Sequence, residues 1–162
     1  MLKPGHFRCL QTIAKQLEKL KFYLQQESRL LMRMADAMTS KQLRQSIQLA
    51  AQECAQYAIE IEGQLSSLGY TAMLPDLSDE SNTIPDLQEE TVMSPEIEEV
   101  IHQCKQEELR LMKVYREVLN EPFLMNDLRN LVRRQYNGIL CAFLQLKLLD
   151  SRYTYYGIET YF

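Results

Sequence analysis

Apolar residues recur every three or four positions along four long stretches of the chain, the spacing that lines one face of a helix. The stretch LEKLKFYLQQESRLLMRM, residues 17–34, shows this spacing most clearly. Residues 70–93 have no helical period and contain two prolines, so they are predicted to be a connecting link. The pattern therefore predicts four helices, at about residues 6–38, 41–68, 94–119 and 124–149.

Residues typical of helix ends stand at several of these boundaries. Ser40 can cap the second helix, and Gly69 is a plausible stop after it. The third helix is predicted to begin at Ser94-Pro95-Glu96, where a hydroxyl cap precedes a proline at the first helical position. These signals support separate helices with short turns inside each half of the chain.

The lengths of the connections predict how the helices are arranged. Short turns make the first two helices antiparallel, and likewise the last two. The link 70–93 is long enough to run the length of a helix of about 42 Å, so the second and third helices can be parallel. The prediction is an all-α, ferritin-like four-helix bundle of two antiparallel hairpins joined by a long crossover, in a single domain covering residues 1–162. The aromatic tail 150–162 is expected to fold back or to fill an oligomer contact.

Two of the apolar stripes carry an acid where a leucine is expected. Glu27 falls between Leu24 and Leu31, and Glu108 holds the equivalent position in the third helix. Counting residues from each turn places Glu27, Glu108 and Gln135 at about one height, with Glu53 at the edge of its stripe. A buried carboxylate must be paired, protonated or bound to a metal, so the sequence predicts a functional or structural polar layer in the core.

The preferred interpretation of this layer is a hydrogen-bonded network. Glu27 and Glu108 would share protons with Gln135 and with nearby tyrosines, for which the candidates are Tyr23, Tyr57 and Tyr136. Such layers fix the register of helices at some cost in stability. No cofactor is expected in this interpretation.

The alternative interpretation is a carboxylate site for iron or manganese. The usual bundle site takes one Glu from each of two helices and Glu-x-x-His from each of the other two. Gln56 and Gly138 stand where the two histidines would be, so the site would be degenerate. A Glu-x-x-His at Glu99 and His102 lies two to three turns from Glu108 and is predicted to be a surface pair. The candidate metal ligands are Glu27, Glu53, Glu108 and Gln135.

Composition and charge narrow the function classes further. Hydrophobic residues make up 46% of the 162 residues and charged ones 25%, as in ordinary globular proteins. No apolar run approaches the roughly 20 residues of a membrane span, and no signal peptide is recognisable. The net charge of −4 argues against nucleic-acid binding, and the basic cluster Arg129, Arg133 and Arg134 is interpreted as a solvated helix face.

The four cysteines, Cys9, Cys54, Cys104 and Cys141, form no CxxC pair. Scattered cysteines of this kind favour a reducing, cytoplasmic location. No phosphate-binding loop or nucleophilic triad is recognisable, so no catalytic residue is predicted.

The third and fourth helices carry a family resemblance. EEVIHQCKQEELRLMKVYREVL and LRNLVRRQYNGILCAFLQLKLLD resemble an uncharacterised bacterial family of ferritin-like four-helix bundles, a domain of unknown function. The matching positions include Glu108, Tyr115, the Gln135-Tyr136 pair and Lys147. That family often has a His two turns after the Gln-Tyr pair, where this chain has Phe143. The resemblance implies a ferritin-like fold and no established activity.

The sequence thus leads to three functional expectations. The first is a non-catalytic structural or interaction module that self-associates, a homodimer being the commonest arrangement. The second is a metal-binding or stress-related protein with a degenerate carboxylate site. The third is a carrier of a small ligand at the polar layer.

Overall fold

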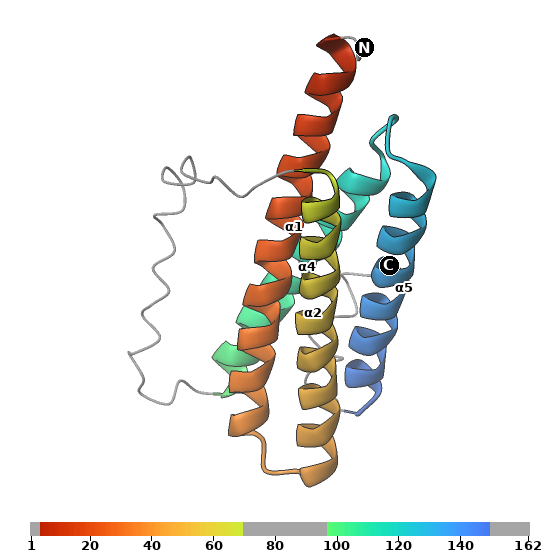
Figure 1. Ribbon diagram of the computed structural model, residues 1–162. Coiled ribbons are helices and arrows are strands. Elements are labelled where there is room, and N and C mark those ends of the chain that lie inside the picture. Colours follow the sequence, from red (N-terminus) through yellow and green to blue (C-terminus); the bar gives the residue numbers. More distant parts are fainter. Residues whose placement is uncertain (1–3, 70–96, 150–162) are drawn as a thin grey trace.

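Four helices make up the part of the chain that the structure describes. The computed structural model describes residues 4–69 and 97–149. The helices are α1 (Pro4–Ala37), α2 (Lys41–Ser67), α4 (Ile97–Leu119) and α5 (Asn126–Leu149), shown in Figure 1. The four-helix, all-α prediction is therefore confirmed. The predicted link 70–93, the predicted start of the third helix at 94–96 and the tail 150–162 lie outside the described residues.

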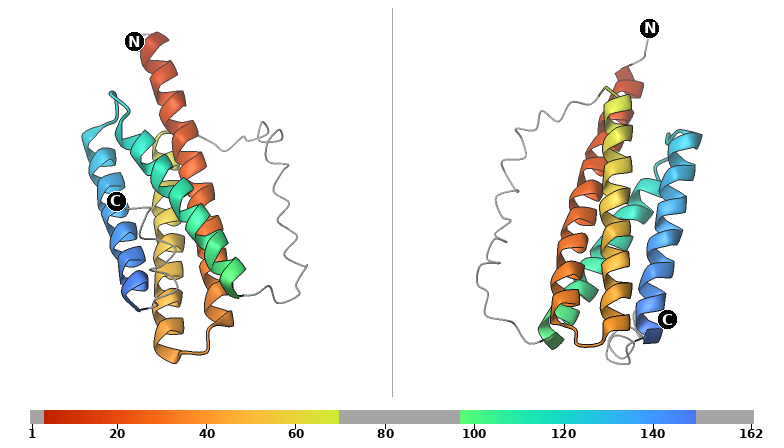
Figure 2. Two further views of the ribbon diagram at one scale, coloured as in Figure 1. Left: turned by 180° about the vertical axis from the view of Figure 1, so that it is seen from behind. Right: turned by 60° about the horizontal axis from the view of Figure 1, so that its bottom comes forward.

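The helices pack side by side as a bundle. α1 contacts α2 and α4, and α5 contacts the same two helices from the other side. Figures 1 and 2 show that α1 and α5 run in one direction while α2 and α4 run in the other. Neighbouring helices are therefore antiparallel, and the two diagonal pairs are parallel, as the connection lengths predicted for the second and third helices.

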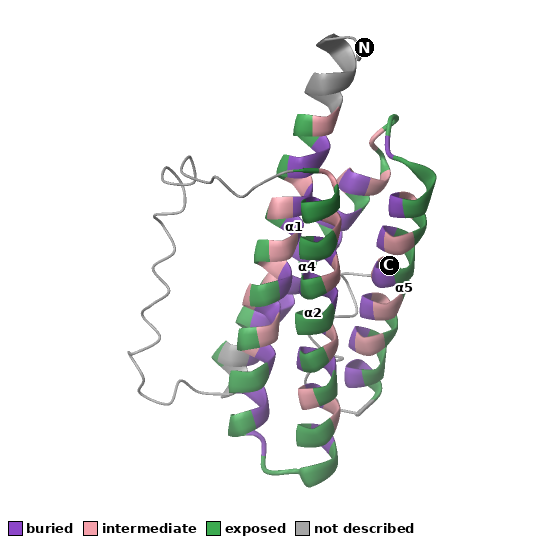
Figure 3. Cartoon of the chain, in the orientation of Figure 1, coloured by how far each residue is buried: buried purple, intermediate pink, exposed green. Residues whose placement is uncertain are grey.

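The predicted apolar stripes form the core. Figure 3 shows buried positions along the inward faces of the helices and exposed positions along their outer faces. On α5 the periodic positions Leu131 and Ala142 are only half-buried, whereas the neighbouring Val132 and Phe143 are buried. Periodicity identifies the centre of a stripe, whereas the neighbouring helices decide which of its edges is covered.

The helix ends show why the elements begin and stop where they do. The Ser40 hydroxyl accepts a hydrogen bond from the Leu43 N–H at 3.3 Å, which is a regular N-cap. Gly69 follows α2 with φ of +77°, a backbone conformation that favours glycine, so its predicted role as a stop is confirmed. α5 begins two residues later than predicted because Leu124 is buried within the turn that precedes it.

The turn between α4 and α5 is held by Arg129. Its guanidinium donates hydrogen bonds to the backbone carbonyls of Leu119 and Glu121, the latter at 2.9 Å. Carbonyl groups at the end of a helix lack partners inside the helix, so Arg129 stabilises the end of α4. The predicted solvated cluster is therefore divided, since Arg129 is half-buried while Arg133 and Arg134 are exposed. No helix among the described residues combines the length and the apolar character needed to cross a membrane.

Candidate functional site

The interior of the bundle encloses several polar side chains. Within the described residues, the buried polar or charged ones are Glu27, Lys105, Glu108, Gln135 and Lys147. They fall into two groups, since Gln135 and Lys147 are twelve residues apart on α5, or about 18 Å along the helix. We call Glu27, Lys105, Glu108 and Lys147 the ion cluster, and the groups bonded around Gln135 the amide network.

Glu108 is the centre of the ion cluster. Its Oε1 lies 3.0 Å from the Nζ of Lys105, one turn earlier on α4, and its Oε2 lies 3.5 Å from the Nζ of Lys147 on α5. Both carboxylate oxygens therefore face an amine. Burial raises the pKa of Glu108, and the two lysines act in the opposite direction. This buried carboxylate therefore joins α4 to α5.

Glu27 enters the same cluster from α1. Its side chain is fully buried, and within the part of the chain that the structure describes neither carboxylate oxygen has a hydrogen-bond partner. Burial, and then the negative charges of Glu108 and Glu107, raise the pKa of Glu27 well above the ordinary value of 4.5. This environment favours the protonated form of the carboxyl group, and the charge of Lys105 acts in the opposite direction.

Two buried thiols border Glu27. Burial, and then the charge of Glu27, raise the pKa of both Cys54 on α2 and Cys104 on α4. Both are free thiols, as is the exposed Cys141. α2 and α4 lie diagonally, and none of their described Cα atoms lie within 8 Å of each other, so Cys54 and Cys104 are too far apart for a disulfide without a rearrangement.

Lys147 completes the cluster. Burial lowers the pKa of its amine to about 7, helped by the neighbouring amine of Lys105 and opposed by Glu108. An ordinary lysine has a pKa near 10.5. The two amines therefore share one carboxylate, and one of them is poorly compensated if both are charged.

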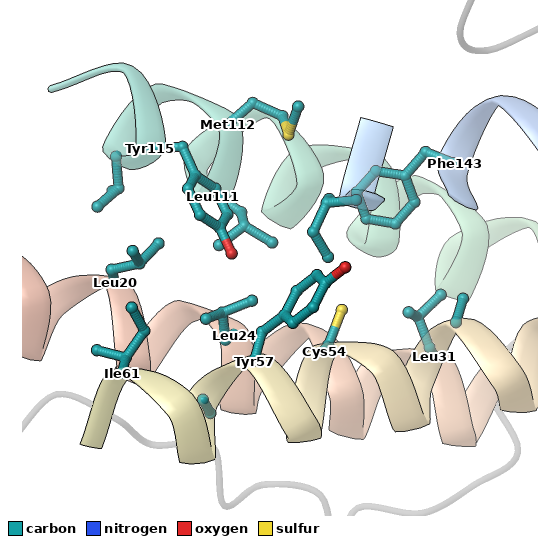
Figure 4. Packing of buried hydrophobic residues seen from close by; sticks show 14 of the residues in the cluster. Leu20, Leu24, Leu31, Cys54, Tyr57, Ile61, Leu111, Met112, Tyr115 and Phe143 are labelled. Atoms are coloured by element: carbon teal, nitrogen blue, oxygen red, sulfur yellow. The ribbon is translucent and has the colours of Figure 1, made fainter. Parts of the chain in front are cut away.

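The amide network lies between α2, α4 and α5. Gln135 accepts a hydrogen bond from the Tyr115 hydroxyl at 3.0 Å and donates to the Glu60 carboxylate at 2.8 Å and to the Tyr57 backbone carbonyl at 3.3 Å. The Tyr57 hydroxyl donates to Glu53 at 2.6 Å. Figure 4 shows the hydroxyls of Tyr57 and Tyr115 pointing into the interior from opposite sides. The Gln135 amide therefore links three helices through groups whose hydrogen bonds are satisfied.

Gly138 makes room for this network. A Cβ atom at Gly138 would lie 2.1 Å from the Tyr57 hydroxyl and 3.0 Å from Oε2 of Glu53. The position where the metal-binding pattern would place a histidine is therefore filled by a tyrosine hydroxyl from α2. Gln56, at the other histidine position, is exposed.

The structure brings together only part of the layer expected from the sequence. Glu27 and Glu108 are both fully buried and influence each other electrostatically, whereas Gln135 and Glu53 belong to the amide network. Counting residues from the turns gave the wrong height for Gln135 along the bundle, for two reasons. Residues 120–125 form a turn that includes the buried Leu124. In addition, α4 is inclined to its neighbours (Figure 2). Equal residue counts on α4 and α5 then no longer correspond to equal heights.

The sequence reasoning missed the two lysines of the ion cluster. Lys105 stands four residues after Ile101 and three before Glu108, and Lys147 stands four after Phe143, so both follow the helical period of the core. This spacing was the signal that could have identified them, because a lysine on the buried face of a helix is usually paired with an acid. Tyr115 and Glu60 were likewise not identified as the partners of Gln135.

The four candidate metal ligands are divided between the ion cluster and the amide network. Among the described residues, no group of three or more His, Cys, Asp and Glu side chains is placed to hold a metal ion. Glu99 and His102 are exposed, as predicted, and the His102 ring lies 3.1 Å from Gln106. Lysine amines already face both oxygens of Glu108, where a bound cation would be repelled.

The fold and the site define an all-α four-helix bundle with an ionic cluster and an amide network inside an otherwise apolar core. No family model, no curated protein and no solved structure matches the chain.

Proposed function

We propose that the chain is a non-catalytic bundle of the ferritin-like class that acts as a structural or interaction module. The antiparallel neighbours and parallel diagonals support this class, because a long crossover between α2 and α4 produces that set of directions. The proposal includes a cytoplasmic location and self-association as a homodimer. It differs from the metalloprotein members of the class in the use of its interior acids.

The observation that carries the proposal is the pairing of Glu108. Lys105 and Lys147 lie 3.0 and 3.5 Å from its two oxygens, so the acid is paired within its own chain. Buried ion pairs of this kind select one packing arrangement among several, at some cost in stability. The amide network has the same effect between α2, α4 and α5.

One observation favours the second candidate, a carboxylate site for iron or manganese. Glu27 is buried beside Glu108 with neither oxygen hydrogen-bonded within the described residues. The two lysines argue against this candidate, because their amines lie against both oxygens of Glu108 and would have to leave before a cation could enter.

The metal content of the protein separates the two candidates. The protein is purified without chelator, and iron, manganese and zinc are measured by mass spectrometry. We expect less than one metal per chain, unchanged in the Glu27→Gln, Glu108→Gln double variant and in a Glu99→Ala, His102→Ala control. Stoichiometric metal that the Gln variant loses while it keeps its helical circular dichroism would overturn the proposal.

A further inference from the structure

The ion cluster contains two acids and two amines, and its total charge can be zero in two ways. Either all four groups are ionised, or Lys105 and Glu108 are ionised while Glu27 carries a proton and Lys147 is a neutral amine. The two states differ only in the position of one proton. The contacts of the cluster decide between them.

The surroundings of Glu27 disfavour its ionised form. It is fully buried and has no hydrogen-bond donor within the described residues, so its negative charge would be neither solvated nor paired. After burial, the largest influence on its pKa is the like charge of Glu108, and the opposing influence of Lys105 is smaller. The protonated acid avoids both costs.

The contacts of Lys147 disfavour two charged amines. Lys105 is nearer to the shared carboxylate, at 3.0 Å against 3.5 Å, so Glu108 pairs more closely with Lys105 than with Lys147. The Lys147 amine also interacts with that of Lys105. An ammonium group has donors but no acceptor, whereas a neutral amine can accept a hydrogen bond from Lys105.

Groups on α1, α2 and α4 set the electrostatic field around the ion cluster. Glu27 faces the cluster from α1, and the thiols of Cys54 on α2 and Cys104 on α4 adjoin it. Glu107 acts on Glu27, and Arg33 acts on Cys104. Glu108 and Glu107 repel an ionised Glu27 more than Lys105 attracts it, so they favour the same proton position as the contacts do.

We propose that the ion cluster is a proton-responsive latch between α4 and α5, closed while Lys147 is an uncharged amine and weakened when Lys147 takes up a proton. This inference adds a means of regulation to the structural module. It rests on the proposed function, in which Glu27 and Glu108 hold no metal, and it is tested separately by the titration of Lys147.

The latch predicts two opposed effects of pH on stability. The Lys147 pKa of about 7 lies below its unfolded value, so its contribution to stability rises as pH rises from about 7 to about 10.5. The folded pKa of Glu27 lies above its unfolded value, so its contribution is present below about pH 4.5 and is lost as pH rises through the folded pKa. The two effects oppose each other near neutrality in the wild-type protein, and single variants separate them.

The first test observes Lys147 directly. The side-chain signals of isotope-labelled lysines are followed by NMR from pH 5 to 10. We expect one lysine to titrate near pH 7, to be missing in Lys147→Met and to remain in Lys113→Met, a control at an exposed position of α4. If every lysine titrates near its ordinary value, the latch proposal is wrong.

The second test measures urea unfolding of the wild type, Glu27→Gln and Lys147→Met at several pH values. Relative to wild type, the unfolding constant of Glu27→Gln should fall by up to about tenfold per pH unit as pH rises from 5 to 7. That of Lys147→Met should fall by a similar factor per unit as pH decreases from 9 to 7. Glu62→Gln and Lys113→Met, at exposed positions, should show no such trend.

The fully ionised alternative gives the opposite result. If all four groups are charged, Glu27→Gln and Lys147→Met each leave a buried charge without its counterion. Both variants would then be much less stable than wild type at pH 7. Such a result would overturn the latch.

Discussion

At the residue scale, the interior of this bundle tolerates charge because each charged group has a specific compensation. The carboxylate of Glu108 lies against two amines, and the amine of Lys105 lies against Oε1 of that carboxylate. Glu27 is compensated by protonation, which burial favours. Gln135 has partners for both its oxygen and its nitrogen. These groups select one packing arrangement of the helices, and they contribute little to the free energy of unfolding.

Replacing Glu27 by leucine tests this account at a single residue. We expect Glu27→Leu to be neutral or to stabilise the protein by up to about 2 kcal/mol at pH 7, because an apolar side chain of similar size removes a desolvated acid. Urea unfolding followed by circular dichroism measures the change. Leu24→Ala, at a fully buried position one turn away, is the control and should cost about 2–5 kcal/mol. A loss of several kcal/mol in Glu27→Leu would show that the acid is needed for folding.

At the scale of helices, the contact between α2 and α5 depends on a glycine, Gly138, which has no side chain. Gly138 leaves the space that the Tyr57 hydroxyl occupies, and this lets Tyr57 reach Glu53 while its backbone carbonyl accepts from Gln135. Glycine inside a helix lowers its stability by about 1 kcal/mol relative to alanine. The close approach of the two helices offsets that cost.

A double-mutant cycle measures the importance of this close approach. Gly138→Ala should destabilise the protein by about 1–3 kcal/mol, because its Cβ would overlap the Tyr57 hydroxyl. In a Tyr57→Phe background the same change should cost clearly less, since the overlapping atom is gone. Gly63→Ala, where nothing lies within 4 Å, should instead stabilise α2 by up to about 1 kcal/mol. Equal costs of Gly138→Ala in both backgrounds would contradict this interpretation.

At the scale of the whole molecule, the four helices share one core. The buried apolar residues form a single cluster drawn from α1, α2, α4 and α5, with the ion cluster and the amide network enclosed in it. Because each helix covers an apolar face of two others, no hairpin of this bundle has a separate core. Unfolding is therefore expected to be cooperative.

Thiol labelling tests this cooperativity. Cys54 on α2 and Cys104 on α4 are buried, whereas Cys141 on α5 is exposed and provides a reference that reacts without denaturant. We expect Cys54 and Cys104 to become reactive at the same urea concentration, which should equal the midpoint seen by far-UV circular dichroism. If Cys104 reacts at lower urea than Cys54, then α4 detaches before the rest of the bundle unfolds.

The sequence by itself determined the number of helices, most of their boundaries and the residues at the centre of each buried face. These properties depend on local spacing and on helix-end residues such as Ser40 and Gly69, and both are visible in a single chain. It also showed that Glu27, Glu108 and Gln135 lie on buried faces, because each interrupts an apolar stripe.

Only the tertiary structure decided which of these polar groups meet. The height of one helix against another depends on the turn at residues 120–125 and on the inclination of α4, and neither has a periodic signal. The structure therefore separated Gln135 from Glu108 and brought in Lys147 instead. Long lysine side chains reach several ångströms from their own helix, so their partners follow from packing and not from sequence spacing.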